Sequence, residues 1–247
     1  MQVLQASGLR FTYRGAREPA LRGLDLEVGE GEIVGLLGPN GAGKTTAISL
    51  CTGLLPCREG EIRHFGQDLR RAPVSLRRRL GLVPQEVALY GTLTVEENLR
   101  FFGRLLGLRG GDLDRGVALA LERTFLDDVR DRPVRTLSGG LRRRANLAAG
   151  LVHGPGLLFL DEPTVGVDTQ SREAILESLA RLAREGLSML YTTHYLEEAE
   201  RLCHRVVIMD RGRVLVAGTP GTLRERHPGC PDLRALFLDL TGRDVRD

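Results

Sequence analysis

The fold is decided by the stretch Gly38-Pro39-Asn40-Gly41-Ala42-Gly43-Lys44-Thr45-Thr46. The apolar run at 33–37 predicts a buried strand that leads into it, and residues 46–50 predict a helix that follows it. The stretch matches the pattern G-x-x-x-x-G-K-[ST] in full, and this pattern between a strand and a helix is typical of phosphate binding. We therefore call residues 38–46 the phosphate loop and predict that the chain binds a nucleotide.

The residue types in this loop suit that task. Gly38, Gly41 and Gly43 allow the backbone to turn so that successive N–H groups and a helix N-terminus point at one anion. Lys44 is expected to reach the β- and γ-phosphates, and the Thr45 hydroxyl to bind Mg²⁺. The alternative is an ordinary glycine-rich turn, which the flanking strand and helix argue against.

Length and composition indicate a globular protein. The 247 residues allow one large domain or a core that carries an inserted lobe, and 42% of them are hydrophobic and 27% charged. The net charge of +3 is too small to imply nucleic acid. No apolar run approaches the ~20 residues that span a bilayer, and the N-terminus does not resemble a signal peptide, so we expect a cytoplasmic chain. The cysteine spacings do not match a zinc site.

The first third of the chain is predicted to be rich in strands. Residues 3–11 and 21–28 alternate apolar and polar side chains, which indicates two antiparallel strands joined by a loop. Tyr13 follows the first of these, where it is either a half-buried strand-end residue or an exposed aromatic that stacks on a purine ring. Residues 60–66 and 80–85 predict two further short strands, and Gln85 ends the second.

Helices without intervening strands are predicted between about residues 87 and 140. Thr94 followed by Glu97 is a capping box at the start of a helix, and a second helical pattern covers residues 112–126. These helices indicate a small lobe inserted in a β/α core.

A second helix start that suits an anion is predicted at Leu137-Ser138-Gly139-Gly140, which we call the signature segment. Ser138 is expected to cap the helix at 141–152, and the two glycines leave its first N–H groups uncovered. The alternative is an ordinary capped helix. The basic residues 142–144 are interpreted as an exposed helix face.

Polar side chains follow two strands that are predicted to be buried. The run at 157–160 leads into Asp161, which is placed to hold Mg²⁺, and Glu162, which is placed to orient or deprotonate an attacking water. The alternative is a solvated strand end. The strand at 188–193 leads into His194, which can hydrogen-bond a γ-phosphate or its water. A hairpin at 205–217 and one or two short helices from residue 219 onward complete the chain.

Taken in order, these motifs resemble those of ABC-type ATPases over residues 4–219. The resemblance rests on Tyr13, the phosphate loop, Gln85, the signature segment, residues 157–162, Asp168 and His194. It implies an α/β phosphate-loop NTPase core with a mostly parallel, RecA-like sheet, an N-terminal antiparallel β subdomain and the inserted helical lobe. We expect this domain to cover residues 1–220, with a short helical tail at 221–247.

The resemblance also implies ATP and Mg²⁺ as ligands and a role for each motif. Tyr13 stacks on adenine, all residues of the phosphate loop contact ATP, and Thr45, Gln85 and Asp161 surround Mg²⁺. The signature segment, through Ser138, Gly139 and Gly140, binds the γ-phosphate of ATP held by a second subunit, and Asp168 lies across that interface. The active form is then a head-to-tail homodimer or a pair with a similar ATPase subunit. Lys44, Gln85, Glu162 and His194 take part in hydrolysis.

One departure from the common family pattern points to a branch of it. Leu141 stands where Gln is common, as in ATPase subunits that power exporters of drugs, lipids or polysaccharides through a separate permease chain. The resemblance therefore implies a protein peripheral to the inner face of the cell membrane, with the permease docked near Gln85 and around Leu89, Tyr90 and Leu93.

Two other functions stay open at this point. One is a soluble ABC-type ATPase that acts on the ribosome, on DNA or on an assembly scaffold, although the chain has neither two cassettes nor a long coiled-coil insertion. The other is a module that binds ATP without hydrolysing it, against which the presence of Glu162 argues.

Overall fold

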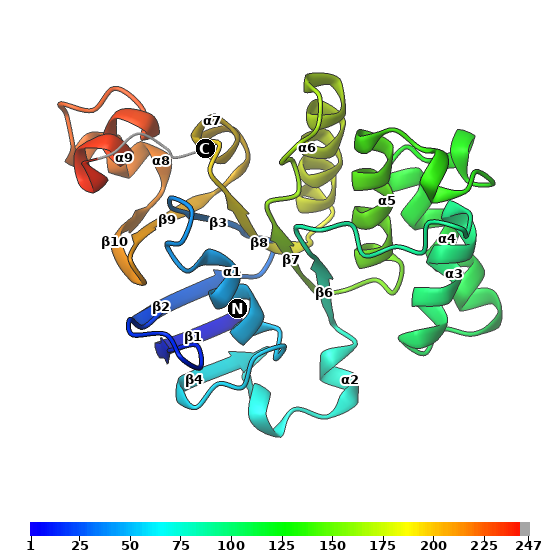
Figure 1. The fold of residues 1–247 in the computed structure, drawn as a ribbon, viewed down its shortest axis with the longest axis horizontal. Coiled ribbons are helices and arrows are strands. Elements are labelled where there is room, and N and C mark those ends of the chain that lie inside the picture. The colour runs from blue at the N-terminus through cyan, green and yellow to red at the C-terminus, as the bar shows by residue number, and fades with distance from the viewer. Residues whose placement is uncertain (243–247) are drawn as a thin grey trace. The chain divides into compact units, whose positions relative to one another are not determined.

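The computed structural model describes residues 1–242 and has the predicted α/β fold (Figure 1). The chain divides into two compact units. The first unit contains Met1–Pro73 and the chain from Ser188 onward, and the second contains Val74–Leu187. The phosphate loop belongs to the first unit and the signature segment to the second.

The first unit contains an antiparallel sheet, as the alternating pattern predicted. Leu4, Ala6 and Leu9 are buried on its longest strand, where Leu4 is paired with Val28. The strands lie in the order β2-β1-β4-β5. Their bounds are Gln2–Phe11 for β1, Leu21–Gly29 for β2, Glu59–His64 for β4 and Gln67–Asp68 for β5, and a 3-10 turn at Leu69–Arg71 follows.

The first unit also contains the strand that leads into the phosphate loop. Strand β3 is buried throughout and lies parallel to β8 and β9, while β10 pairs with β9 in the predicted hairpin. Arg211 and Gly212 both have positive φ at its turn, as a type I′ hairpin turn requires. The bounds are Ile33–Leu37 for β3, Ser188–Thr193 for β8, Arg205–Asp210 for β9 and Arg213–Gly218 for β10.

Helices complete the first unit. Helix α7 packs on β3 and β8, α9 packs on α7, and α8 packs on β10 (Figure 1). Their bounds are Lys44–Cys51 for α1, Leu196–Leu202 for α7, Pro220–Arg226 for α8 and Leu233–Thr241 for α9. The tail therefore contains two short helices, and residues 243–247, which were predicted to belong to it, lie outside the described part of the chain.

The second unit contains two parallel strands and the helices that surround them. Strand β7 is buried along its whole length and pairs in parallel with β6, and helix α5 packs on β6. The bounds are Val74–Arg77 for α2, Leu80–Val83 for β6, Gly139–Leu151 for α5, Leu157–Asp161 for β7 and Thr169–Arg184 for α6.

The predicted helical lobe has its own apolar core. Helices α3, Val95–Leu105, and α4, Gly110–Arg123, pack on each other and on α5, and two 3-10 turns at Asp127–Val129 and Val134–Thr136 connect them. Thr94 accepts a hydrogen bond from the Glu97 N–H at 3.1 Å, and Glu97 accepts one from the Thr94 N–H at 2.8 Å, so the capping box is confirmed. Buried side chains from Val95 to Val152 form the lobe's core.

Within residues 1–242, none of the helices combines the length and the apolar character that a membrane span requires. The same residues include no cluster of three or more His, Cys, Asp or Glu side chains that could hold a metal ion. Cys51, Cys57, Cys203 and Cys230 are all free thiols.

Candidate nucleotide site

The phosphate loop connects β3 to α1 and wraps around the amino group of Lys44. Lys44 begins α1 and is 5% exposed. Its Nζ donates hydrogen bonds to the carbonyl oxygens of Gly38 at 2.8 Å and Pro39 at 3.3 Å. The loop therefore holds a positive charge at the N-terminus of a helix, where the dipole also favours an anion.

Close packing explains two of the loop's glycines, and backbone conformation explains a third. A Cβ atom at Gly38 would lie 2.5 Å from the carbonyl oxygen of Met209 in β9. At Gly43 it would lie 2.6 Å from that of Ala20, and φ there is +109°. Gly41 has open space but a φ of +80°, which side chains disfavour. Gly38 and Gly43 therefore leave no room for a side chain, and Gly41 adopts a backbone conformation that favours glycine.

Tyr13 lies beside the phosphate loop. Its hydroxyl is hydrogen-bonded to the Thr46 hydroxyl at 3.1 Å, and its ring makes an edge contact with Phe11. The side chain is 46% exposed, so a large part of the ring faces solvent. This placement next to the loop supports a role in stacking on a base.

His194 follows β8 at the same edge of the sheet as the phosphate loop. In the parallel pair of β3 and β8, Leu37 is opposite Thr193, so the loop and His194 begin side by side. The Thr193 hydroxyl accepts a hydrogen bond from the Tyr195 N–H at 2.9 Å and fixes the turn that presents His194. Ligands bind at the carboxyl ends of strands in such sheets.

In the second unit, Gln85 and Glu162 lie together. Val83 of β6 is opposite Leu160 of β7, so the segments that follow these strands start at the same edge. The Gln85 amide donates a hydrogen bond to Glu162 Oε2 at 3.4 Å. Glu162 is 6% exposed and has a φ of +47°, a costly backbone conformation that concentrates at functional sites. A solvated strand end does not explain these features.

Asp161, the last residue of β7, is also buried, with 4% of its surface exposed. Mg²⁺ takes carboxylate oxygens as ligands, so this residue type suits the predicted Mg²⁺ role.

The signature segment caps α5, as predicted. Ser138 accepts a hydrogen bond from the Leu141 N–H at 3.3 Å. The two glycines of this segment differ in the space around them. A Cβ atom built at Gly139 would have no atom of residues 1–242 within 4 Å, apart from its neighbours in helix α5. A Cβ atom built at Gly140 would lie 1.8 Å from Ser171 Oγ. Gly140 therefore allows α5 to pack against the start of α6, and Gly139 leaves an open face.

Asp168 has a structural role that the sequence analysis missed. It caps α6 by accepting hydrogen bonds from the Ser171 N–H at 2.9 Å and the Ser171 hydroxyl at 2.8 Å, and these bonds lower the pKa of the Asp168 carboxyl. Asp168 and Ser171 are three residues apart at a helix start, which is a signal for an N-cap.

The interpretation of residues 142–144 as an exposed face is wrong for two of the three arginines. Arg142 is exposed, but Arg143 donates hydrogen bonds to the carbonyl oxygens of Gln85 and, at 3.1 Å, Val165. Arg144 donates one to the carbonyl oxygen of Phe125 at 3.0 Å. Burial lowers the pKa of both guanidinium groups. Helix α5 contacts other segments through both of these side chains, and three consecutive arginines in the sequence do not indicate this.

The structure thus groups the predicted site residues within each unit. Tyr13, the phosphate loop and His194 lie in the first unit, and Gln85, the signature segment, Asp161, Glu162 and Asp168 lie in the second.

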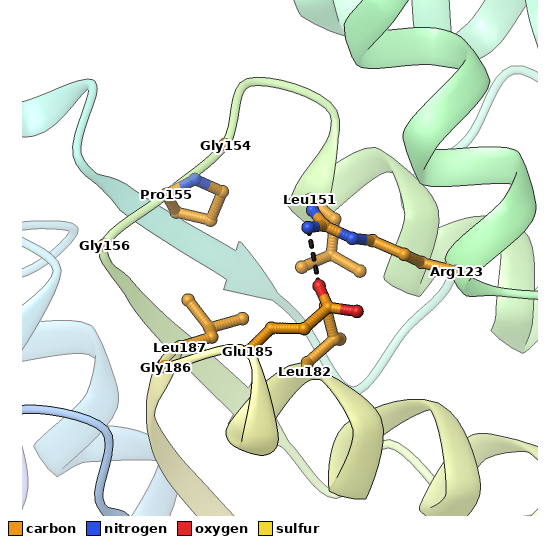
Figure 2. A pocket seen from close by; sticks show the side chains of 9 residues that line it. All are labelled: Arg123, Leu151, Gly154, Pro155, Gly156, Leu182, Glu185, Gly186 and Leu187. Carbon is orange, nitrogen blue, oxygen red and sulfur yellow. Dashed lines mark hydrogen bonds and ion pairs between the residues drawn. The ribbon is translucent and has the colours of Figure 1, made fainter.

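A hollow in the second unit has no part in this chemistry. Figure 2 shows the residues that line it, among them Gly156, which precedes β7. Its volume is about 280 Å³. An ion pair of 2.6 Å between Arg123 and Glu185 crosses it. It lies at the amino end of β7, whereas Asp161 and Glu162 lie at the carboxyl end.

Known proteins are similar to this chain in sequence and fold. The sequence profile of the family described as ABC transporter matches residues 21–165. The linearmycin resistance ATP-binding protein LnrL of Bacillus subtilis is 42% identical over 92% of this chain and 72% of its own length. The Nod factor export ATP-binding protein I of Ralstonia nicotianae is 39% identical over 98% of this chain and 78% of its own length. The daunorubicin resistance ATP-binding protein DrrA2 of Streptomyces coeruleorubidus is 44% identical over 90% of this chain and 68% of its own length.

Solved structures of ATP-binding cassettes have a fold similar to that of this chain. A structure of the ATP-binding subunit of an ABC transporter has a TM-score of 0.86 and 31% identity, and the match covers 97% of this chain and 99% of that one. A dimeric ATP-binding cassette bound to ADP and phosphate has a TM-score of 0.79 and 25% identity over 87% of this chain and 98% of its own. The chain belongs to the ABC transporter family.

Proposed function

We propose that this chain is the ATP-hydrolysing subunit of an exporter whose membrane permease is a separate chain. The observation that carries the proposal is the hydrogen bond between Gln85 and the buried, conformationally strained Glu162 at the end of β7. A chain that only binds nucleotide has no need of such a carboxylate. The relatives named for drug resistance and Nod factor export support the direction of transport.

The residues of the phosphate loop bind ATP in this proposal. The backbone N–H groups of the phosphate loop, which Pro39 lacks, and the Lys44 amino group contact the phosphates, and Tyr13 stacks on adenine. Glu162 orients and deprotonates the attacking water, Gln85 holds that water in place, and His194 hydrogen-bonds the γ-phosphate.

The hydroxyl, carboxylate and amide groups at the proposed site suit a Mg²⁺ ion that binds together with the nucleotide. Mg²⁺ keeps several waters and takes one or two protein ligands beside the phosphates. The exposed Thr45 hydroxyl at the start of α1, the buried Asp161 carboxylate and the Gln85 amide would hold it. When bound, the ion neutralises charge on the phosphates.

The open face at Gly139 supports a composite site with a second copy of the chain. A helix start that has room for a ligand suits the γ-phosphate of ATP bound to a partner. In a two-fold dimer, each phosphate loop then faces the signature segment of the other subunit, with Asp168 at the interface. The dimeric ATP-binding cassette among the similar structures supports this arrangement.

The permease docks on exposed aromatic side chains of the second unit. Tyr90 is 51% exposed and makes an edge contact with Phe101, which is 38% exposed. Tyr90 follows Gln85 in the chain, so a helix that presses on it can influence hydrolysis. In this proposal the protein lies on the inner face of the cell membrane.

The proposal is tested by isolating the tagged chain from detergent-solubilised membranes of its own cells and measuring phosphate release. We expect ATP turnover and the recovery of a polytopic membrane protein. Tyr90→Glu should lose the membrane protein and keep basal turnover, while Leu119→Glu, at a 46% exposed apolar position on α4, should keep both. Turnover without any membrane partner would favour the soluble ATPase, and lack of turnover would favour the ATP-binding module.

A further inference from the structure

Arg143 joins two loops that carry the proposed hydrolytic residues. One end of its guanidinium donates to the carbonyl oxygen of Gln85, and the other donates to that of Val165 at 3.1 Å. The Val165 N–H donates in turn to the carbonyl oxygen of Glu162 at 3.3 Å. The planar fork of one arginine therefore spans the segment after β6 and the segment after β7.

The environment of Arg143 indicates a specific role. Burial lowers the pKa of its guanidinium, and the charge of Glu162 acts in the opposite direction. Taking an arginine partly out of water is unfavourable unless its donors find well-placed acceptors. Arg142, the preceding residue, stays exposed. A positive charge needed only for solubility would occupy the exposed position.

Helix α5 holds the Gln85 segment at a second point. Asn146, one turn after Arg143, is 3% exposed. Its side chain donates to the carbonyl oxygen of Pro84 at 3.1 Å and accepts from the Ala88 N–H at 3.1 Å. Residues three apart on a helix lie on one face, so this face of α5 fixes residues 84–88.

We propose that Arg143 is a positioning residue for ATP hydrolysis. By fixing the carbonyl groups of Gln85 and Val165, it keeps the Gln85 amide against the Glu162 carboxylate. The inference rests on the proposed function, because it takes Glu162 as the base. Lysine should replace Arg143 only in part, since a single ammonium group does not reproduce the planar fork.

The test compares Arg143→Ala and Arg143→Lys with Arg142→Ala, which removes the same charge one residue earlier in α5. Steady-state turnover is measured over a range of MgATP concentrations. We expect Arg143→Ala to lower kcat by about tenfold to a hundredfold, as small misplacements of reacting groups do, with KM within about twofold of wild type. Arg143→Lys should have an intermediate kcat, and Arg142→Ala should match wild type.

A double-mutant cycle identifies the route of the effect. If Arg143 acts through Gln85, Arg143→Ala should lower kcat much less in a Gln85→Ala background than in wild type. The inference would be overturned if the decreases in kcat of the two single variants multiplied in full in the double variant. A raised KM with unchanged kcat, or wild-type kcat in both Arg143 variants, would also overturn it. If Arg143→Ala does not fold, a folded Arg143→Lys with wild-type kcat overturns it. A wild-type chain without turnover overturns the proposed function as well, whereas wild-type turnover that is insensitive to Arg143 overturns this inference alone.

Discussion

Replacing Gly139 by alanine should separate folding from catalysis. A Cβ at Gly139 meets no atom of residues 1–242 within 4 Å outside its own helix, and its φ is not in the left-handed region. Alanine is a better helix former than glycine by up to ~1 kcal/mol, so Gly139→Ala should leave the free energy of unfolding unchanged or raise it by that amount. The added methyl group would nevertheless occupy the face proposed for the partner's γ-phosphate.

Gly140 provides the matched control. Its Cβ would lie 1.8 Å from Ser171 Oγ and 2.3 Å from Ser171 Cβ, so alanine forces α5 and α6 apart or moves Ser171. Overpacking of this kind costs about 1–3 kcal/mol. Gly140→Ala should therefore destabilise the chain, and adding Ser171→Gly should restore part of the loss.

Two assays distinguish these effects. Urea unfolding without nucleotide measures stability, and phosphate release measures turnover. We expect Gly139→Ala to unfold at the same or a higher urea concentration than wild type and to lose at least about tenfold in turnover, because the displaced phosphate no longer meets its catalytic groups. Wild-type turnover in Gly139→Ala would refute the placement of the partner's nucleotide at the signature segment.

Two further predictions concern stability. Thr94→Ala removes the cap of α3 and should lower the free energy of unfolding by about 1 kcal/mol, with turnover retained. Urea unfolding measures the first effect and phosphate release the second. An unchanged urea midpoint would mean that the capping box does not stabilise the lobe. His64 is fully buried, and its Nε2 lies 2.7 Å from the carbonyl oxygen of Cys51. Burial lowers the pKa of the His64 imidazole, so the folded chain keeps it neutral, whereas the unfolded chain protonates it below about pH 6.5. Stability should therefore fall as the pH drops below that value, by up to ~1.4 kcal/mol per pH unit from this group. His64→Gln should reduce this slope in urea unfolding between pH 7 and 5.5, and the same slope in both proteins would contradict the assignment.

The sequence contains enough information to predict most elements and the residues at their ends. Apolar runs bounded by Gly or Pro indicated β3, β7 and β8, and this was sufficient to place the phosphate loop, Glu162 and His194 at strand ends. Helix α6 begins at Thr169 because the Asp168 side chain caps it.

Contacts between distant parts of the chain were not predictable. Gln85 and Glu162 are 77 residues apart, and only the register of β6 on β7 brings them within 3.4 Å. The difference between Gly139 and Gly140 depends on where α6 packs, and the burial of Arg143 depends on two loops that come from other parts of the sequence. Periodicity identifies the face of a helix but not what covers it.

The central claim is that Glu162 drives hydrolysis in an ATP-closed dimer. Glu162→Gln keeps the size of the side chain and removes its basicity, so ATP should bind without being consumed. Light scattering during gel filtration, with and without MgATP, measures the oligomeric state directly. We expect Glu162→Gln to be a monomer without nucleotide, to become a stable dimer with MgATP and to lose turnover by orders of magnitude. A monomer at saturating MgATP that hydrolyses at the wild-type rate would contradict it.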